Sequence, residues 1–176
     1  MNLLVAALVA LFVREAPQME AVAIERAQVV VAACERTNPY DDAFVRICAY
    51  MAFRESRMDV DALGDWWKRV GGKLRACRRT DPACRAHSRG AWQLQVYVER
   101  APWARAACPN TSRDTAYGGA CLFAASLTYW RGIVGNDDAL VLASHMAGVR
   151  GGTFTTRSMA RTRVVRARAL VSGVVI

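Results

Sequence analysis

Residues 48–58 read Cys-Ala-Tyr-Met-Ala-Phe-Arg-Glu-Ser-Arg-Met and carry a single carboxylate, Glu55, at the end of an apolar run. Helical spacing puts four residues on one stripe: Val45, Cys48, Ala52 and Glu55. We expect this stripe to face the core, where a carboxylate loses hydration unless a partner or a reaction uses it. Glu55 is therefore a general acid, one half of an ion pair with Arg54 or Arg57, or a solvated residue at the helix end.

The same periodicity predicts further helices along the chain. They cover residues 18–36, 39–57, 120–134 and 138–147. Asn38 and Pro39 suit the N-cap and the first position of the second helix, and Gly148 suits the end of the last one.

Shorter elements connect these helices. Residues 66–89 are basic, and their pattern predicts a short helix followed by a loop that Cys77 and Cys84 close. Residues 88–97 alternate as a short strand does, whereas residues 98–117 read as irregular. The predicted fold class is therefore mainly α, with a small β element.

The composition describes one basic globular domain. The 176 residues are 53% hydrophobic and 22% charged, which is enough for a core and excludes a disordered chain. The net charge is +9, and Lys68 and Lys73 are the only lysines among the 24 cations. This charge favours a polyanionic partner, and nucleic acid, anionic lipid and an anionic cell wall all meet that description.

Six cysteines occur at positions 34, 48, 77, 84, 108 and 121. An even number is typical of a protein with disulfides in an oxidising compartment, and buried free thiols are the alternative. We predict three local pairs: Cys34–Cys48, Cys77–Cys84 and Cys108–Cys121. A zinc site at Cys77, Cys84 and His87 would lack a fourth ligand, so we expect no metal and no cofactor.

The N-terminus has two interpretations. Residues 3–13 form an uninterrupted apolar run, too short for a membrane span of about 20 residues. The run has the length of a signal-peptide core, yet no Lys or Arg precedes it, and Arg14 and Glu15 stand where a cleavage site belongs. Residues 1–16 are thus either a signal peptide or a packed N-terminal helix, and the cysteines favour export.

The remainder of the chain divides into a domain over residues 17–156 and a basic tail over residues 157–176. The tail contains five arginines: Arg157, Arg161, Arg163, Arg166 and Arg168. We interpret it as a charged surface helix, with binding to an anionic wall, a lipid surface or nucleic acid as the alternative.

Four short motifs follow one another in the chain: Glu55-Ser56, Gly90-Ala91-Trp92-Gln93-Leu94, the helix 120–131 and Ala143-Ser144-His145-Met146-Ala147-Gly148. Their order and spacing resemble those of the soluble lytic transglycosylases, in which the corresponding segments read Glu-Ser, Gly-Leu-Met-Gln-Ile, a core helix and Ala-Ala-Tyr-Asn-Ala-Gly. The resemblance covers residues 40–150. Each motif alone is short enough to occur by chance, so the combination of the four carries the resemblance.

The resemblance implies a lysozyme-like α+β fold, in which a helical domain and a small β element flank a glycan-binding cleft. It implies peptidoglycan glycan strands as the substrate and the β-1,4 bond between N-acetylmuramic acid and N-acetylglucosamine as the cleaved link. Related goose-type lysozymes share a single glutamate and hydrolyse the same bond. We therefore expect an exported, monomeric lytic transglycosylase or muramidase that binds no nucleic acid, with anionic wall polymers as a further candidate partner.

Cleavage of such a bond assigns a role to Glu55. The leaving oxygen needs a proton, and a carboxyl group in apolar surroundings, where a pKa rises, can donate it. The resulting carboxylate then takes a proton from the sugar's own 6-hydroxyl, giving a 1,6-anhydro product, or from water. For hydrolysis, Asp59, Asp61 and Asp65 are candidates to position the water, although we prefer to interpret them as loop residues.

Five residues are candidates for substrate binding: Ser56, Trp92, Gln93, Tyr97 and His145. Gln93 would bond the glycan from a strand edge, and Trp92, in place of the family's methionine, either stacks on a sugar or fills the core. His145 replaces the family's tyrosine, which bonds near the glutamate, and Met146 replaces its asparagine. This changed pair motivates an alternative function, a catalytically weak wall-binding module of the same fold.

Overall fold

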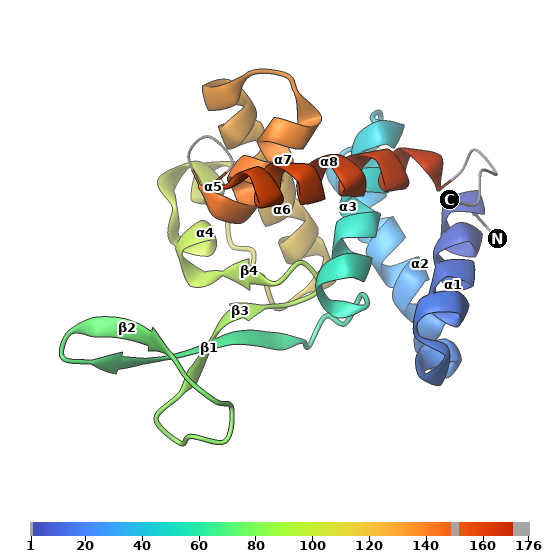
Figure 1. Cartoon of the computed structure of the whole chain (residues 1–176). Helices are drawn as coiled ribbons and strands as arrows, with labels where there is room; N and C mark the ends of the chain where they lie inside the picture. The colour runs from blue at the N-terminus through green and yellow to red at the C-terminus, as the bar shows by residue number, and fades with distance from the viewer. Residues whose placement is uncertain (1, 149–151, 171–176) are drawn as a thin grey trace.

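The computed structural model describes residues 2–148 and 152–170. Helices make up most of the structure, and a small antiparallel sheet lies to one side of them (Figure 1). The prediction of a mainly α protein with a small β element is confirmed.

The helices are α1 (Leu3–Glu15), α2 (Glu20–Thr37), α3 (Asp42–Ser56), α4 (Val96–Arg100), α5 (Pro102–Ala107), α6 (Ala116–Val134), α7 (Asp138–Ala147) and α8 (Phe154–Ala169), with a 3-10 turn over Pro17–Met19. The strands are β1 (Leu63–Val70), β2 (Lys73–Ala76), β3 (Arg85–Arg89) and β4 (Leu94–Gln95). The predicted helices over residues 18–36, 120–134 and 138–147 correspond to α2, α6 and α7.

Helix α3 lies in the middle of the helical layer and packs against α1, α2, α6 and α8. The stripe predicted from its sequence faces the core, because Val45 is 6% exposed and Cys48 and Ala52 are fully buried. Helix α3 begins later than predicted, since the Asp41 carboxylate accepts a hydrogen bond from the Phe44 amide at 2.9 Å and caps it. The prediction of Asn38 as N-cap is wrong.

Asn38 instead ends the preceding helix. Its amide donates to the Cys34 carbonyl at 3.1 Å, which makes it the C-cap of α2. Pro39 and Tyr40 then form a turn, so the chain reverses before α3 starts. The disulfide between Cys34 and Cys48 joins the two helices across this turn.

The apolar run at the N-terminus forms α1 and packs on the rest of the domain. Its buried residues are Leu4, Val5, Leu8, Leu11 and Phe12. The Phe12 ring meets the Phe53 ring of α3 edge-on, with 5.0 Å between centroids. In this structure the run therefore belongs to the helical core.

Residues 66–76 form a hairpin, so the prediction of a short helix there is wrong. Strands β1 and β2 pair antiparallel across Gly71 and Gly72, whose φ values are 56° and 77°. A two-residue hairpin turn favours positive φ at both positions, and glycine adopts it without steric cost. The sheet continues in the order β2-β1-β3-β4. The strand predicted over residues 88–97 is only partly present, because β3 ends at Arg89, residues 90–93 form a turn, β4 has two residues and α4 begins at Val96.

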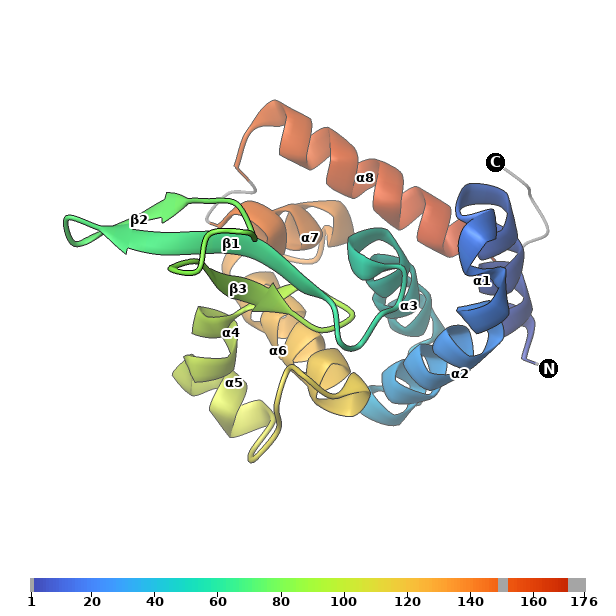
Figure 2. The same cartoon turned by 90° about the horizontal axis from the view of Figure 1, so that it is seen from below.

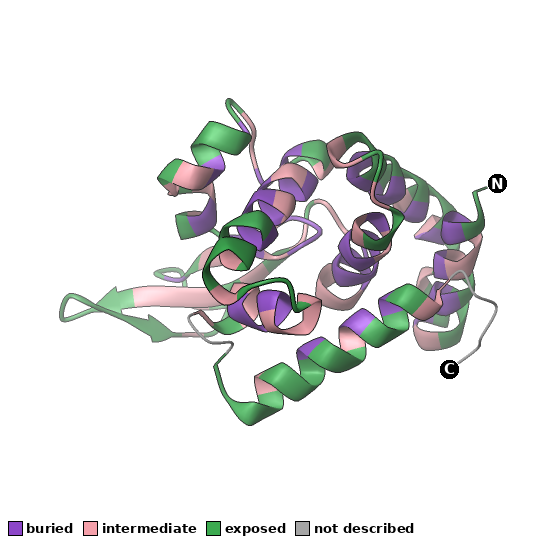
Figure 3. Ribbon diagram, turned by 90° about the horizontal axis from the view of Figure 1, so that it is seen from above, coloured by how far each residue is buried: buried purple, intermediate pink, exposed green. Residues whose placement is uncertain are grey.

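Residues 98–107 are helical, where irregular structure was predicted. Pro102 takes the first position of α5, where its missing amide hydrogen costs nothing. Residues 157–169 of the basic tail lie in α8, which agrees with the interpretation of a charged surface helix, and residues 171–176 of the tail lie outside the described residues. Only Ala160, Val164 and Ala167 of α8 are buried, and most of the helix is exposed (Figure 3).

All three predicted disulfides form: Cys34–Cys48, Cys77–Cys84 and Cys108–Cys121. They fit a protein exported to an oxidising compartment. Because Cys77 and Cys84 are bonded to each other, their thiols cannot hold zinc. Within residues 2–148 and 152–170, no helix has both the length and the apolar content that a membrane span requires.

Candidate functional site

Glu55 lies in the last turn of α3, where the buried stripe reaches the surface. The helix is apolar up to this point, and Met51, Ala52 and Phe53 are all buried. The Glu55 side chain is 28% exposed, so it is partly shielded from solvent but not enclosed. The helix thus carries a carboxylate to the boundary between the core and the surface, as the sequence predicts.

The partner of Glu55 is Arg163 of α8, which is 108 residues away in the chain. The Arg163 guanidinium donates to the Glu55 carboxylate and also contacts the sulfur atoms of Met51, at 3.8 Å, and Met146, at 3.7 Å. Only 15% of the Arg163 side chain is exposed. A charge-assisted bond in this setting stabilises the negative charge of the carboxylate.

The prediction that Glu55 pairs with Arg54 or Arg57 is wrong, because Glu55 pairs with Arg163 and the two nearer arginines pair with another carboxylate. Arg54 donates to the carboxylate of Glu15 on α1 at 2.8 Å. Arg57 lies 3.6 Å from the same carboxylate. Helix α1 therefore draws both arginines away from Glu55.

Ser56 connects the end of α3 to the turn before β4. Its hydroxyl donates to the Ala91 carbonyl at 2.8 Å and accepts a hydrogen bond from the Asp59 amide at 3.0 Å. The first of these bonds brings the Glu55-Ser56 motif and the Gly90–Leu94 motif together, although 35 residues separate them. Ser56 thus ties the last turn of α3 to the turn before β4.

The backbone after Ser56 is strained. Arg57 and Met58 have φ values of 58° and 59°, in the left-handed region that non-glycine residues seldom adopt. Their amides donate to the carbonyls of Phe53 and Ala52 at 3.0 Å and close the end of α3. Strained backbone of this kind often accompanies functional sites, where the surrounding structure offsets its cost.

Gln93 also has a left-handed backbone, with φ of 48°. Its side-chain amide donates to the carbonyls of Gly90, at 3.0 Å, and Ala62, at 3.2 Å, and its oxygen accepts from the Ser88 hydroxyl at 3.2 Å. These bonds fix the orientation of Gln93 at the junction of β1, β3 and the turn. Its role in substrate binding stays a prediction.

Glycine is needed at the start of this turn. Gly90 has φ of 75°, and a Cβ atom there would lie 2.2 Å from the Arg113 carbonyl oxygen. Any larger residue would push the loop before α6 away from the turn that holds Gln93.

Trp92 and Tyr97, the aromatic candidates, lie in opposite environments. Trp92 is 3% exposed, and its indole N–H donates to the Cys48 carbonyl at 2.9 Å. In this position it supports α3 from within the core. Tyr97, on α4, is 58% exposed and is therefore open to a ligand.

His145, on α7, points into the helical core. Its Nδ1 atom lies 2.8 Å from the hydroxyl oxygen of Ser126, and its ring meets the Phe123 ring edge-on at 5.0 Å. Burial lowers the pKa of His145 to about 4, so the imidazole is neutral at physiological pH. The next residue, Met146, is the one that touches the partner of Glu55.

This environment makes stability depend on pH. The neutral imidazole is favoured in the folded state, whereas in the unfolded chain the imidazole has its ordinary pKa of 6.5 and gains a proton below that pH. Stability is therefore greatest above pH 6.5 and falls as the pH drops towards 4, by about 2 to 3 kcal/mol in all. In urea unfolding between pH 4 and 7, His145→Gln should show a shallower dependence, and equal slopes for both proteins would contradict this assignment.

Two residues of this region escaped the sequence reasoning. Arg163 is one of five arginines in the tail, and the sequence of the tail does not indicate which of the five contacts α3. Arg113 is 7% exposed and donates to the carbonyls of His87, at 2.7 Å, and Leu94, at 2.8 Å. It ties the loop before α6 to the sheet, and burial lowers its pKa from the ordinary value.

Of the three aspartates after α3, Asp59 and Asp61 are loop residues as interpreted, whereas that interpretation is wrong for Asp65. Asp59 pairs with Arg26 of α2 at 3.0 Å, and its other oxygen accepts from the Asp61 amide at 3.0 Å. Asp65 lies within β1 with φ of 49°.

Next to Glu55, a groove runs between α3 and α8. Its lining includes Tyr50 and Arg54 from α3 and Phe154, Met159 and Arg163 from α8. Arg163 thus reaches both the groove and the candidate acid.

The end of α3 that carries Glu55 and the turn that carries Gln93, joined by the Ser56–Ala91 hydrogen bond, are the strongest candidate site in the described part of the chain. The side chains of Glu55 and Gln93 themselves have other partners, Arg163 for the first and Gly90, Ala62 and Ser88 for the second. No family model, curated protein or solved structure matches this chain. Its function is therefore inferred from the geometry of these residues.

Proposed function

We propose that this protein is a lysozyme-like enzyme that cleaves peptidoglycan glycan strands with Glu55 as its single general acid and base. One observation carries the proposal: the Ser56 hydroxyl bonds the Ala91 carbonyl at 2.8 Å, which joins the acid-bearing end of α3 to the turn that presents Gln93. A glycosidase with one carboxylate needs an acid on a rigid element beside polar groups that orient the sugar. In this proposal the end of α3 carries the acid, and Gln93 contacts the sugar after its amide exchanges a bond to Gly90 or Ala62 for one to the substrate.

The chemistry proceeds in two proton transfers. Glu55, in its protonated form, gives its proton to the oxygen that links N-acetylmuramic acid to N-acetylglucosamine, and the bond from that oxygen to the anomeric carbon breaks. The 6-hydroxyl of the N-acetylmuramic acid then attacks the anomeric carbon of its own ring, and the Glu55 carboxylate takes the proton of that hydroxyl. The product carries a 1,6-anhydro ring. Attack by water instead gives the hydrolysed product.

The local backbone supports this assignment. Three of the non-glycine residues with positive φ, Arg57, Met58 and Gln93, flank the same junction. Such conformations are costly, and they persist where function or surrounding structure requires them. The disulfides are consistent with work outside the cytosol, where peptidoglycan lies.

The test is digestion of purified peptidoglycan by the full chain, followed by mass spectrometry of the soluble fragments. We expect fragments that end at N-acetylmuramic acid. An anhydro end has one water less in mass than a hydrolysed end, so the same spectrum identifies the reaction. If no fragment is released under conditions where a control muramidase clears the wall, the proposal is wrong.

The ion pair between Glu55 and Arg163 supports a second candidate, a wall-binding module of the same fold with weak catalysis. A general acid must reach its substrate, and in this structure a partly buried arginine occupies the Glu55 carboxylate. In that case the wild-type protein binds wall without releasing fragments. Sedimentation with purified wall, measured beside the digestion, separates the two functions.

Under the leading proposal, Arg163 must leave Glu55 before the proton is donated. Arg163→Gln should therefore raise the rate of wall digestion by roughly tenfold, as expected when a charge-assisted bond of about 1.5 kcal/mol no longer holds the carboxylate. Arg161→Gln, an exposed arginine on the same helix, is the matched control and should leave the rate unchanged. A slower Arg163→Gln enzyme would instead place Arg163 among the residues that assist catalysis.

A further inference from the structure

The positive charge of this protein is concentrated in residues 66–89, which we name the basic arm. The arm contains eight Lys or Arg residues and one acid, Asp81, so it carries +7 of the chain's net +9. The rest of the chain has a net charge of only +2. Helix α8 is the other basic element, with five arginines and no acid, but two of them, Arg163 and Arg168, are paired with Glu55 and Asp138. A polyanion would therefore be drawn first to the basic arm.

The outer half of the arm projects beyond the helices (Figures 1 and 2). Strand β2 is the edge of the sheet and pairs with β1 alone, and all four of its residues are exposed. Charged side chains on such a hairpin are open to a large ligand from both faces.

The arm also places like charges opposite one another. Lys68 on β1 is the direct cross-strand partner of Arg75 on β2. Because alternate residues share a face, Lys68, Lys73 and Arg75 belong to one face of the hairpin. Like charges directly opposite each other destabilise a sheet. Asp81 offsets this repulsion at Lys68, and a bound polyanion would offset it at Arg75.

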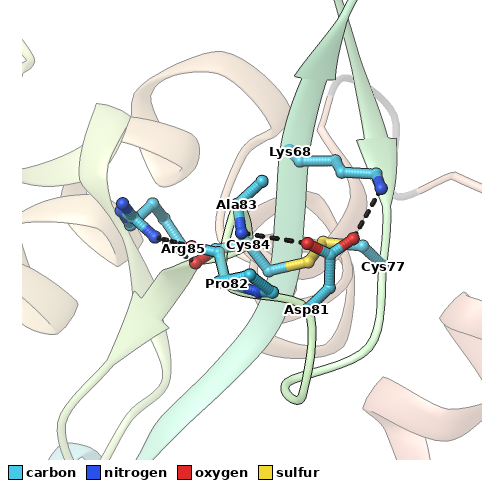
Figure 4. Close-up of a disulfide and its surroundings, with 7 residues drawn as sticks. All are labelled: Lys68, Cys77, Asp81, Pro82, Ala83, Cys84 and Arg85. Carbon is cyan, nitrogen blue, oxygen red and sulfur yellow. Dashed lines mark hydrogen bonds and ion pairs between the residues drawn. A yellow bond between two sulfur atoms is a disulfide. The ribbon is translucent and has the colours of Figure 1, made fainter.

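The single acid of the arm is used within its own loop. The Asp81 carboxylate accepts from Lys68 Nζ at 2.5 Å and from the Ala83 amide at 2.9 Å, beside the Cys77–Cys84 disulfide (Figure 4). The Arg79 guanidinium lies over the Trp66 ring, 5.7 Å from its centroid. In the part of the chain that the structure describes, six cations of the arm form no ion pair: Arg69, Lys73, Arg75, Arg78, Arg79 and Arg85.

We propose that the basic arm binds a phosphodiester polymer of the cell envelope, in which phosphate groups link short polyol units. An arginine fork binds two phosphate oxygens at once, and a lysine adds a compact charge. A flexible chain of phosphates can follow cations that repeat every second residue along the hairpin. That the polymer comes from the cell envelope rests on the proposed function and on the disulfides. That the arm binds a phosphodiester chain rests only on the charges and geometry of the arm.

The test measures binding of the full chain to purified poly(glycerol phosphate), with single-stranded DNA and vesicles of anionic phospholipid in parallel. We expect the polymer to bind, with at least roughly tenfold weaker affinity at 200 mM than at 50 mM salt, because binding releases counterions. Tighter binding to DNA would identify a nucleic-acid surface instead. Tighter binding to the vesicles would identify a membrane surface, and either result overturns the proposal.

Two triple variants with the same change in net charge locate the site. The arm variant carries Lys73→Gln, Arg75→Gln and Arg78→Gln, and we expect it to bind the polymer at least tenfold more weakly. The control carries Arg100→Gln, Arg105→Gln and Arg161→Gln, all at exposed positions outside the arm, and should lose less than threefold. Equal losses would show that net charge alone attracts the polymer and would overturn the proposal.

Failure of this inference is distinguishable from failure of the proposed function. Glu55→Gln should bind the polymer as the wild type does, whatever happens to wall digestion. The arm variant should still cleave short glycan fragments that carry no phosphate.

Discussion

Glu55→Gln is expected to lose at least roughly a hundredfold in the rate of wall digestion while it still folds. Glutamine has nearly the same shape but cannot donate or accept the catalytic proton, and a positioned acid contributes about 10²- to 10⁴-fold to such a reaction. The side chain keeps an oxygen that accepts from Arg163, so the contact between α3 and α8 can persist. The measurement is the initial rate of turbidity loss of purified wall at matched protein concentrations.

Glu15→Gln is the matched control for this experiment. Glu15 is also a partly buried glutamate bonded to an arginine, with 22% of its side chain exposed and Arg54 at 2.8 Å. Its substitution removes the same charge and a similar ion pair, but from α1. We expect it to keep digesting wall and to be slowed far less than Glu55→Gln, because it releases Arg54 and Arg57 near Glu55 but leaves the acid in place. Equal clearing by the wild type and Glu55→Gln would rule out Glu55 as the acid.

Removal of the Cys34–Cys48 disulfide is expected to be the most damaging change to stability. The bond closes a segment of 14 residues between α2 and α3, and both cysteines are fully buried. Loss of the cross-link should cost about 3 kcal/mol, which lowers the melting temperature of a chain of this size by roughly 6 to 12 °C. The test is thermal unfolding of the double variant Cys34→Ala and Cys48→Ala, followed by circular dichroism.

The disulfide of the basic arm provides the comparison. Cys77 and Cys84 close a loop of the exposed hairpin, so their loss should loosen the arm and leave the melting temperature of the helical core within about 2 °C. A similar fall in both double variants would mean that the arm unfolds together with the core. Polymer binding by the double variant Cys77→Ala and Cys84→Ala should weaken even where its melting temperature does not change.

Much of the helical framework was predictable because its signals are local. The apolar stripe of α3 needed only the spacing of Val45, Cys48 and Ala52. Helix α7 was bounded by Asp137, whose carboxylate accepts from the first amides, and by Gly148 with φ of 82°. The three disulfides also joined cysteines close in sequence, so a guess of local pairing sufficed.

The errors arose where one local signal outweighed another. Residues 66–76 contain many Lys and Arg residues, which favour helices, but the pair Gly71-Gly72 is also a two-residue hairpin turn. Asn38 preceded a proline and looked like an N-cap, while Asp41 was the residue in position to accept from the first turn. In each case the stronger signal was a specific backbone geometry and not a propensity.

The candidate site was only half predictable for a different reason. Glu55, Ser56 and Gln93 stood out by type and spacing, but which residue would meet Glu55 depends on how α8 packs. The contact with Arg163 spans 108 residues, and helical periodicity carries no information about such distances. Trp92 and His145 likewise turned into the core because their polar atoms found the Cys48 carbonyl and Ser126 there.

The ion pairs of Glu15 have a consequence for the charge around the candidate acid. As long as α1 is in place, its last residue holds Arg54 and Arg57, and Glu55 faces one cation instead of three. Loss of that helix would release two further positive groups within one turn of Glu55. Helix α1 thus acts at a distance on the electrostatic setting of the candidate acid, through Glu15.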